Sequence, residues 1–125
     1  MARHVLSVGQ CGFDHGKISR YFKSAYGADV SGAETFDEAL TALRSSEFDL
    51  VLVNRLNDED GAPGIELIRT LKTDPELSTV PVMLVSNYPS AQADATALGA
   101  LPGFGKSDLN TRKAEDCLRA IFGPF

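Results

Sequence analysis

The chain has 125 residues, of which 43% are hydrophobic and 23% are charged, and its formal net charge at pH 7 is −5. This length provides one hydrophobic core and is too short for two domains. The composition is that of an ordinary globular protein, with no bias toward disorder or fibre formation. The lysines and arginines are scattered along an acidic chain, which argues against a nucleic-acid surface because phosphate contacts need clustered positive charge. We expect a protein or small-molecule partner instead.

No apolar run approaches the length of a membrane span, and the few residues ahead of the first strand-like segment leave no room for a signal peptide. The sequence therefore predicts a cytoplasmic protein without membrane attachment. The two cysteines, Cys11 and Cys117, lie far apart and neither belongs to a CxxC pair, so we expect no disulfide and no cysteine metal site. Cys117 falls on an apolar helical stripe, which favours a buried core thiol.

Strand-like and helix-like segments alternate along the chain. Asp14 is expected to cap the first helix and Gly27 to end it. Residues 35–38 have the form of a capping box and open the second helix, and Pro63 marks the start of the third. The last helix is expected to end at Gly123 and Pro124. The strand signals lie at 4–8, 28–30, 48–53, 80–85 and 100–105, and the helix signals at 14–26, 35–43, 65–72, 91–98 and 107–122.

This alternation predicts an α/β protein of the flavodoxin-like (βα)5 type, a three-layer sandwich with helices on both faces of a parallel sheet. Right-handed crossovers favour the strand order 2-1-3-4-5 at this length. The fifth strand has the weakest signal, because Pro102 and two glycines are poor strand formers and only the alternation requires a strand there. Without repeats or linkers, residues 1–125 are expected to form one domain with no attached effector domain.

Asn54 follows the most apolar strand signal, residues 48–53. Four branched aliphatic residues in a row suit a strand that is buried on both faces of a parallel sheet. Open α/β sheets place their binding sites at the carboxyl ends of such strands. The chemistry available to the site therefore depends on what an asparagine can do there.

Over nearly the whole chain the sequence resembles the receiver domain of two-component response regulators, a family of phosphorelay signal transduction. The order and spacing of four segments carry the resemblance: residues 48–53 ahead of position 54, residues 64–67, residues 80–86, and residues 97–100 followed by Lys106. In that family an aspartate after the third strand accepts a phosphoryl group and an acidic pair after the first strand holds Mg²⁺. A hydroxyl and a lysine bind the phosphoryl oxygens.

Carried over by position, the hydroxyl falls on Ser86 and the lysine on Lys106, whereas the acceptor falls on Asn54 and the acidic pair on Gly9 and Gln10. A carboxamide is not a competent nucleophile for phosphoryl transfer. Three neutral groups also offer poor ligands to Mg²⁺, which is usually held through carboxylates. The resemblance therefore implies a degenerate receiver, or pseudo-receiver. We expect it to be no enzyme, to hold no cofactor, and to bind Mg²⁺ weakly or not at all.

Further departures affect the family's output switch. The loop 54–64 is about two residues longer than usual, Asp58 replaces a proline that the family has after the acceptor, and Ser107 replaces the proline after the lysine. The aromatic residue three places before the lysine is Gly103, with Phe104 one place later. We therefore expect the output switch to be altered together with the phosphorylation site.

Lys106 lacks the family's aspartates as counter-charges, and a lysine just ahead of a helix opposes the helix dipole. Two outcomes are open. Either Asp14 or Asp58 pairs with Lys106, which we favour, or Ser86 and Lys106 form a pocket for a phosphate-sized anion. Tyr88 and Phe104 either form a partner-binding patch beside the fourth helix or cover the core.

We therefore expect a signalling module that works by protein interaction, with a histidine kinase or a separate effector as partner. Receivers use the face of helix 4, strand 5 and helix 5 for partners and dimers, so a homodimer through this face is also expected. One alternative is a receiver phosphorylated at a displaced carboxylate, Asp58 or Asp60, although acidic runs in loops are typical of solvated turns. The other is a small-ligand or nucleotide-binding flavodoxin-like protein, for which the sequence has no phosphate-loop signature.

Overall fold

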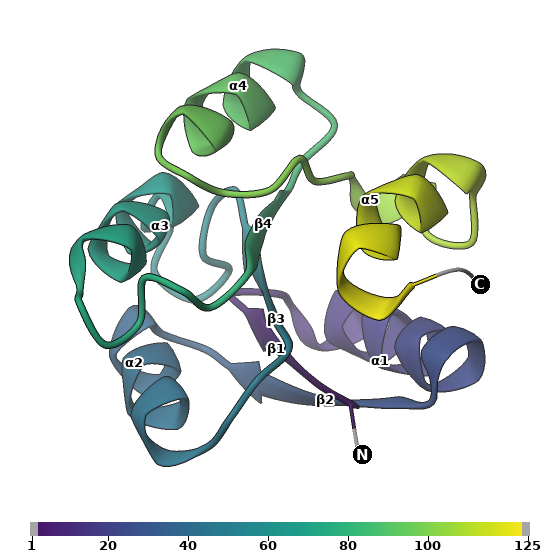
Figure 1. The fold of residues 1–125 in the computed structure, drawn as a ribbon, viewed down its shortest axis with the longest axis horizontal. Helices are drawn as coiled ribbons and strands as arrows, with labels where there is room; N and C mark the ends of the chain where they lie inside the picture. Colours follow the sequence, from purple (N-terminus) through teal and green to yellow (C-terminus); the bar gives the residue numbers. More distant parts are fainter. Residues whose placement is uncertain (1–2, 124–125) are drawn as a thin grey trace.

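The computed structural model describes residues 3–123 and shows one parallel sheet with helices on both faces (Figure 1). The strands pair in the order β2-β1-β3-β4. The strands are β1 (Arg3–Val8), β2 (Ala28–Ala33), β3 (Leu50–Asn54) and β4 (Val82–Val85). The helices are α1 (Gly12–Tyr26), α2 (Phe36–Ser45), α3 (Gly64–Thr73), α4 (Pro89–Ala97), the 3-10 turn η1 (Lys106–Asp108) and α5 (Arg112–Phe122).

Two apolar clusters fill the space on the two faces of the sheet, which gives the expected three layers. Alternate residues of β3 point to opposite faces: Leu50 and Leu52 pack with α1 and α5, and Val51 and Val53 pack with α2, α3 and α4. Figure 1 shows the same division, with α1 and α5 on one side of the sheet and the other three helices on the opposite side. Both faces of β3 are therefore buried, as its unbroken apolar run predicts.

Most of the helix ends follow their sequence signals. The backbone N–H of Glu38 donates to Thr35 Oγ1 at 3.1 Å, which confirms the capping box of α2. Gly27 ends α1 with a φ of 63°, in the left-handed region that glycine favours. The expectation for Asp14 was wrong, because α1 begins at Gly12 with Cys11 at its cap position, and Asp14 lies in the first turn.

The last predicted helix is interrupted. Residues 106–108 form η1, Asn110 has a φ of 64°, and α5 begins only at Arg112. Gly123 ends α5 as expected, with its N–H bonded to the carbonyl oxygen of Arg119, and Pro124 lies outside the described residues. Cys117 is only partly buried, with Sγ 3.7 Å from the carbonyl oxygen of Gly103. Within residues 3–123 no helix is both long enough and apolar enough to cross a bilayer.

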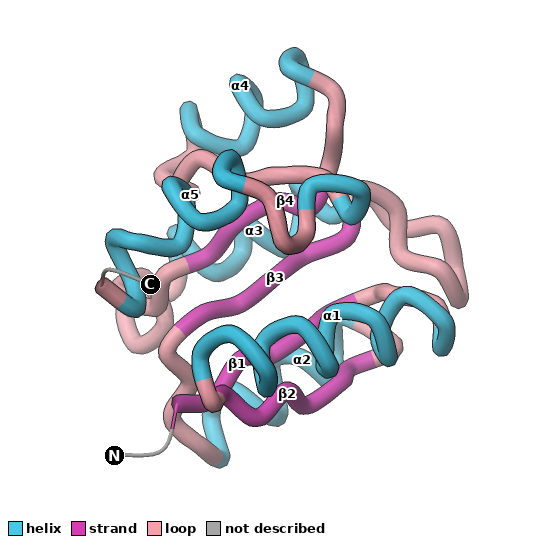
Figure 2. Tube along the Cα trace, turned by 90° about the vertical axis from the view of Figure 1, so that its right-hand side faces the viewer, coloured by secondary structure: helices cyan, strands magenta, loops and turns pink. Residues whose placement is uncertain are grey.

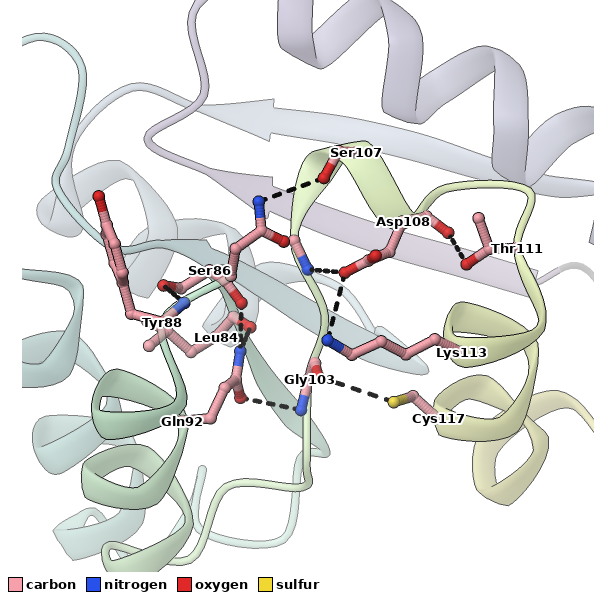
Figure 3. Close-up of polar contacts among 12 residues, drawn as sticks. Leu84, Ser86, Tyr88, Gln92, Gly103, Ser107, Asp108, Thr111, Lys113 and Cys117 are labelled. Carbon is pink, nitrogen blue, oxygen red and sulfur yellow. Dashed lines mark hydrogen bonds and ion pairs between the residues drawn. The ribbon is translucent and has the colours of Figure 1, made fainter.

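The prediction of a fifth strand was wrong, because residues 100–105 run beside β4 without forming a strand. One bridge joins Leu101 to Met83, and the N–H of Leu101 donates to the carbonyl oxygen of Val82. Beyond it the Gln92 amide stands between the two segments: Nε2 donates to the carbonyl oxygen of Leu84 at 2.8 Å, and Oε1 accepts from the N–H of Gly103 at 3.0 Å (Figure 3). The sheet thus has four strands in the order 2-1-3-4, with a side chain in place of the next ladder bond.

Candidate functional site

The candidate site lies where the strands end at their carboxyl termini, at the right of Figure 2. Asn54, Ser86 and Lys106 line one cleft of about 440 Å³. Gly9 and Gln10 line a separate cavity of about 210 Å³. The structure therefore brings together the three positions that correspond by resemblance to the acceptor, the hydroxyl and the lysine, and it places the two positions of the acidic pair around a different cavity.

The Asn54 side chain is tied to the backbone around it. Its Nδ2 donates to the carbonyl oxygens of Gly9 at 3.0 Å and Leu56 at 2.8 Å, and its Oδ1 accepts from the N–H of Arg55 at 3.1 Å. Both amide hydrogens are thus used in joining the end of β3 to the end of β1 and to its own loop. An aspartate carboxylate at this position would have no hydrogens to donate and would face two carbonyl oxygens.

Gly9 is held in a conformation and a space that suit glycine alone. Its φ is 78°, and a Cβ at this position would lie 2.4 Å from Oδ1 of Asn57. Asn57 is 2% exposed, and its Nδ2 donates to Oδ1 of Asp60 at 2.7 Å. The carbonyl oxygen of Gly9 also accepts from the N–H of Asp58 at 2.9 Å. The long loop after β3 therefore occupies the space beside the first position of the acidic pair.

These groups do not fit the Mg²⁺ that the resemblance to receiver domains implies. At Asn54 the two amide hydrogens point toward the carbonyl oxygen of Gly9 and toward the loop, and the amide oxygen is bound by an N–H. Gly9 has no side chain to offer. A hard divalent cation needs converging oxygen donors with negative charge, and this arrangement presents hydrogen-bond donors instead.

Lys106 pairs with Asp14 and not with Asp58, so of the two carboxylates that the sequence offered it is Asp14 that contacts the lysine. Its Nζ lies 2.8 Å from Oδ2 of Asp14, with side chains that are 30% and 23% exposed. The hydrogen bond from Lys106 lowers the pKa of Asp14, against the opposing effect of partial burial. Ser86 is 8% exposed, and its Oγ accepts from the N–H of Tyr88 at 3.1 Å. Lys106 and Ser86 therefore both have partners within the chain.

The two aromatic residues near the cleft have different environments. Phe104 is 2% exposed and belongs to the core beneath α5, so it covers the core. Tyr88 is 58% exposed, and the guanidinium of Arg55 lies 5.0 Å from the centre of its ring. Arg55 and Tyr88 thus form an exposed pair at the rim of the cleft.

The acidic run after β3 divides into residues with different surroundings. Oδ1 of Asp60 accepts from Asn57 and from the N–H of Ala62, and these bonds lower its pKa. Asp60 therefore organises the turn. Asp58 and Glu59 are exposed and line the cavity of Gly9 and Gln10. The repulsion of Glu34 raises the pKa of Glu59.

Sequence reasoning missed three contributors to this edge of the sheet: Asn57, Gln92 and Glu34. Asn57 lies in a polar loop and Gln92 in a helix, and both segments have ordinary compositions. No motif or residue spacing in the sequence identifies either residue as part of the site. A hint for Asn57 existed in the long loop 54–64, whose extra residues place it against Gly9.

Comparison with solved structures places the fold in the class of response-regulator receiver domains. Neither a protein-family model nor a curated protein sequence matches the chain. The chemotaxis protein CheY4 of Vibrio cholerae is similar with a TM-score of 0.77 and 19% identity, over 97% of this chain and 99% of that one. The signal receiver domain of a DNA-binding response regulator from Colwellia psychrerythraea gives a TM-score of 0.73 and 20% identity, over 86% and 88% of the two chains.

A response regulator from Burkholderia pseudomallei, whose structure contains a phosphorylated aspartic acid, a calcium ion and citrate, gives a TM-score of 0.72 and 20% identity. The match covers 95% of this chain and 66% of that one. At these identities the likeness establishes the fold alone. The activity has to be argued from the residues that this chain has at the site.

Proposed function

We propose that this chain is a signalling module with the receiver fold that works by binding a protein partner and not by aspartyl phosphorylation. The observation that carries the proposal is the Asn54 amide, whose three hydrogen bonds to Gly9, Leu56 and Arg55 use the acceptor position to hold the backbone together. An amide in this role supplies no nucleophilic oxygen. The proposal assigns the chain no catalytic activity of its own.

The surroundings of Lys106 support the same proposal. In a phosphorylatable receiver the lysine is a counter-charge for the phosphoryl group, and here Asp14 supplies a permanent negative charge at 2.8 Å. Ser86 is likewise satisfied, by the N–H of Tyr88. Under this proposal the Lys106–Asp14 pair and the Ser86–Tyr88 hydrogen bond stay in place until a partner protein binds.

The partner would be a signalling protein, a histidine kinase or a separate effector, and a second copy of this chain is the other candidate. We place the contact on α4, residues 100–105 and α5. The exposed stack of Arg55 on Tyr88 lies at the start of α4 and offers a cationic and aromatic contact of the kind that is enriched at protein interfaces. Sedimentation analysis of the purified chain tests the homodimer, and Tyr88→Ala is expected to weaken it if this face is used.

The phosphorylation test uses a small-molecule phosphodonor with Mg²⁺ and intact-mass spectrometry. We expect no phosphoryl adduct on the wild-type chain. An adduct would overturn the proposal, and Asp58→Ala and Asp60→Ala would then identify a displaced acceptor. Asp60 is the poorer of these two nucleophiles, because Asn57 and Ala62 already donate to its carboxylate.

The small-ligand alternative is tested separately, by thermal shift in the presence of flavins and nucleotides. No shift is expected, because Asp14 neutralises Lys106 in this cleft, and Arg55, which also lines it, lies over the ring of Tyr88. A saturable shift that disappears in Lys106→Gln would favour a nucleotide-binding function over the proposed one.

A further inference from the structure

Three glutamates from different parts of the chain converge beside the β1 end of the site. Glu34 follows β2, Glu38 lies in the first turn of α2, and Glu59 belongs to the loop after β3. One carboxylate oxygen of each lies within 4.8 Å of the other two. Among the ion pairs of residues 3–123, none involves these three side chains. The cluster therefore concentrates negative charge without an internal counter-charge.

A second and independent observation comes from a cavity that two of these glutamates, Glu34 and Glu38, help to line. Ser7 is 1% exposed and its Oγ has no hydrogen-bond partner within the described chain. The amide oxygen and nitrogen of Gln10 are also buried and unpartnered there. Ser7 and Gln10 line a cavity of about 320 Å³ together with Glu34 and Glu38. Buried polar groups in folded proteins almost always have a partner, so these groups point to something that binds in this cavity.

Gln10 connects the cavity to the third carboxylate. Gln10 and Glu34 line both the cavity of Ser7 and the neighbouring one that contains Glu59. The side chain of Gln10 thus lies where it can offer a neutral amide oxygen beside the three charged ones. The resulting donor set consists of carboxylate and amide oxygens, which suits a hard cation and not a soft one.

The spacing of the carboxylates matches one ion. Ca²⁺ binds oxygen at 2.3–2.6 Å, so ligand oxygens on opposite sides of the ion are about 4.6–5.2 Å apart and neighbouring ones are closer. Oxygens that all lie within 4.8 Å of one another can therefore share a single ion of this size. Mg²⁺ requires near-ideal octahedral geometry, which side chains from three separate segments provide less readily.

We propose that Glu34, Glu38 and Glu59, with the amide oxygen of Gln10, form a binding site for one divalent cation of the Ca²⁺ type. The site shares Gln10 with the position of the receiver family's acidic pair, but its three carboxylates come from other positions, after β2, in α2 and in the loop after β3. Its ligands join the β1–α1 loop, the start of α2 and the long loop after β3. Binding of the ion would fix these three segments relative to one another.

The test is calorimetric titration of the full chain with CaCl₂ at constant ionic strength, alongside thermal unfolding. We expect saturable binding of one ion and a rise in the unfolding midpoint. Glu34→Gln and Glu59→Gln each remove a charged ligand with little change in shape, and each is expected to weaken the affinity about tenfold or more. Glu47→Gln is the matched control, because Glu47 is an exposed glutamate in the loop between α2 and β3. It should bind Ca²⁺ like the wild type.

Two further readouts separate a built site from diffuse attraction to an acidic surface. Gln10→Ala leaves the net charge unchanged. It should therefore weaken Ca²⁺ binding only if the ion is coordinated by the Gln10 amide. Without Ca²⁺, Glu59→Gln should unfold at a higher temperature than the wild type, because it removes repulsion from Glu34. The proposal is overturned if no saturable binding occurs, if Glu47→Gln weakens binding as much as Glu34→Gln, or if Gln10→Ala leaves the affinity unchanged. None of these outcomes depends on phosphorylation.

Discussion

At the carboxyl end of the sheet, two groups of residues satisfy their polar atoms in different ways. In the half at the ends of β1 and β3, the neutral groups of Gly9, Asn54 and Asn57 interlock through backbone contacts. In the half at the end of β4, Ser86 and Lys106 keep the residue types of a phosphate site, and the Lys106–Asp14 ion pair neutralises the cation. The first half offers no carboxylate at positions 9, 10 and 54, and in the second half Lys106 and Ser86 are engaged with Asp14 and Tyr88.

The two halves should therefore respond differently to single substitutions. The interlocked half depends on the absence of a Cβ at Gly9 and on the two amide hydrogens of Asn54, so restoring single acidic residues there should disrupt packing. The β4 half depends on one partly exposed ion pair, and removing the carboxylate should leave an intact cation in an open cleft. Substitutions in the first half should therefore cost more stability than those in the second.

The largest effect is expected for Gly9→Ala. The added Cβ would meet Oδ1 of Asn57 at 2.4 Å, and the φ of 78° strains any residue with a Cβ. We expect a loss of about 2–4 kcal/mol in the free energy of unfolding, measured by urea denaturation. Gly12→Ala is the control, because no atom lies within 4 Å of a Cβ at that position, and its effect should stay within about 0.5 kcal/mol.

Asn54→Asp is expected to cost about 2 kcal/mol near neutral pH, because an ionised carboxylate would face the carbonyl oxygens of Gly9 and Leu56 without hydrogens to donate. The cost should shrink in acid, where the protonated carboxyl regains a hydrogen. Asn110→Asp in the exposed turn before α5 is the control and should change stability by less than about 0.5 kcal/mol. If Asn54→Asp proved neutral at pH 7, the amide would not be what holds this half together.

The sequence predicted the layers and the first four strands because these follow from hydrophobic periodicity. Residues 48–53 were predicted to form a strand buried on both faces, and β3 packs against helices on both sides of the sheet. Which helices cover which face was not predicted. The fifth strand was predicted wrongly, because hydrophobic periodicity does not show which side chains from other elements compete for backbone hydrogen bonds. A side chain from another element, Gln92, takes the hydrogen bonds that a ladder between Leu84 and Gly103 would have used.

At the site, the positions of Asn54, Ser86 and Lys106 were predicted together and lie in one cleft. The pairing of Lys106 could only be narrowed to two carboxylates, because the choice depends on how the loops fold. Asp14 lies in the first turn of α1 and reaches Lys106 from across the edge, whereas Asp58 is held near Gly9 by its own backbone. The role of Asn57 needed the three-dimensional path of the loop and could not be read from its neighbours.

Gln92→Leu tests how far the β4 half depends on side-chain bridging. It keeps the approximate size of the side chain but removes its bonds to the carbonyl oxygens of Leu84 and Ser86 and to the N–H of Gly103. A loss of about 1–2 kcal/mol in the free energy of unfolding is expected. Asp94→Asn on the exposed part of α4 serves as control. Equal stability of the two variants would show that the segment 100–105 is held mainly by packing.

The smallest effect is expected for Asp14→Asn, with a loss of about 1 kcal/mol in the free energy of unfolding at pH 7. Because Lys106 lowers the pKa of Asp14 in the folded chain, the pair stabilises the fold above the carboxyl's ordinary pKa of 3.8. This contribution is lost as the pH falls through the folded-state value. The difference between the wild type and Asp14→Asn should therefore be constant near neutral pH and vanish in acid.

Asp14→Asn also separates the two halves functionally. It should increase the affinity of the cleft for inorganic phosphate, because Lys106 and Ser86 would then lack a competing carboxylate. Asp29→Asn is the control, since Asp29 forms a surface pair with Lys23 whose side chains are 67% and 66% exposed, and it should change neither stability nor phosphate binding. If phosphate binds no better to Asp14→Asn than to the wild type, the pairing with Asp14 is not what keeps phosphate from Ser86 and Lys106.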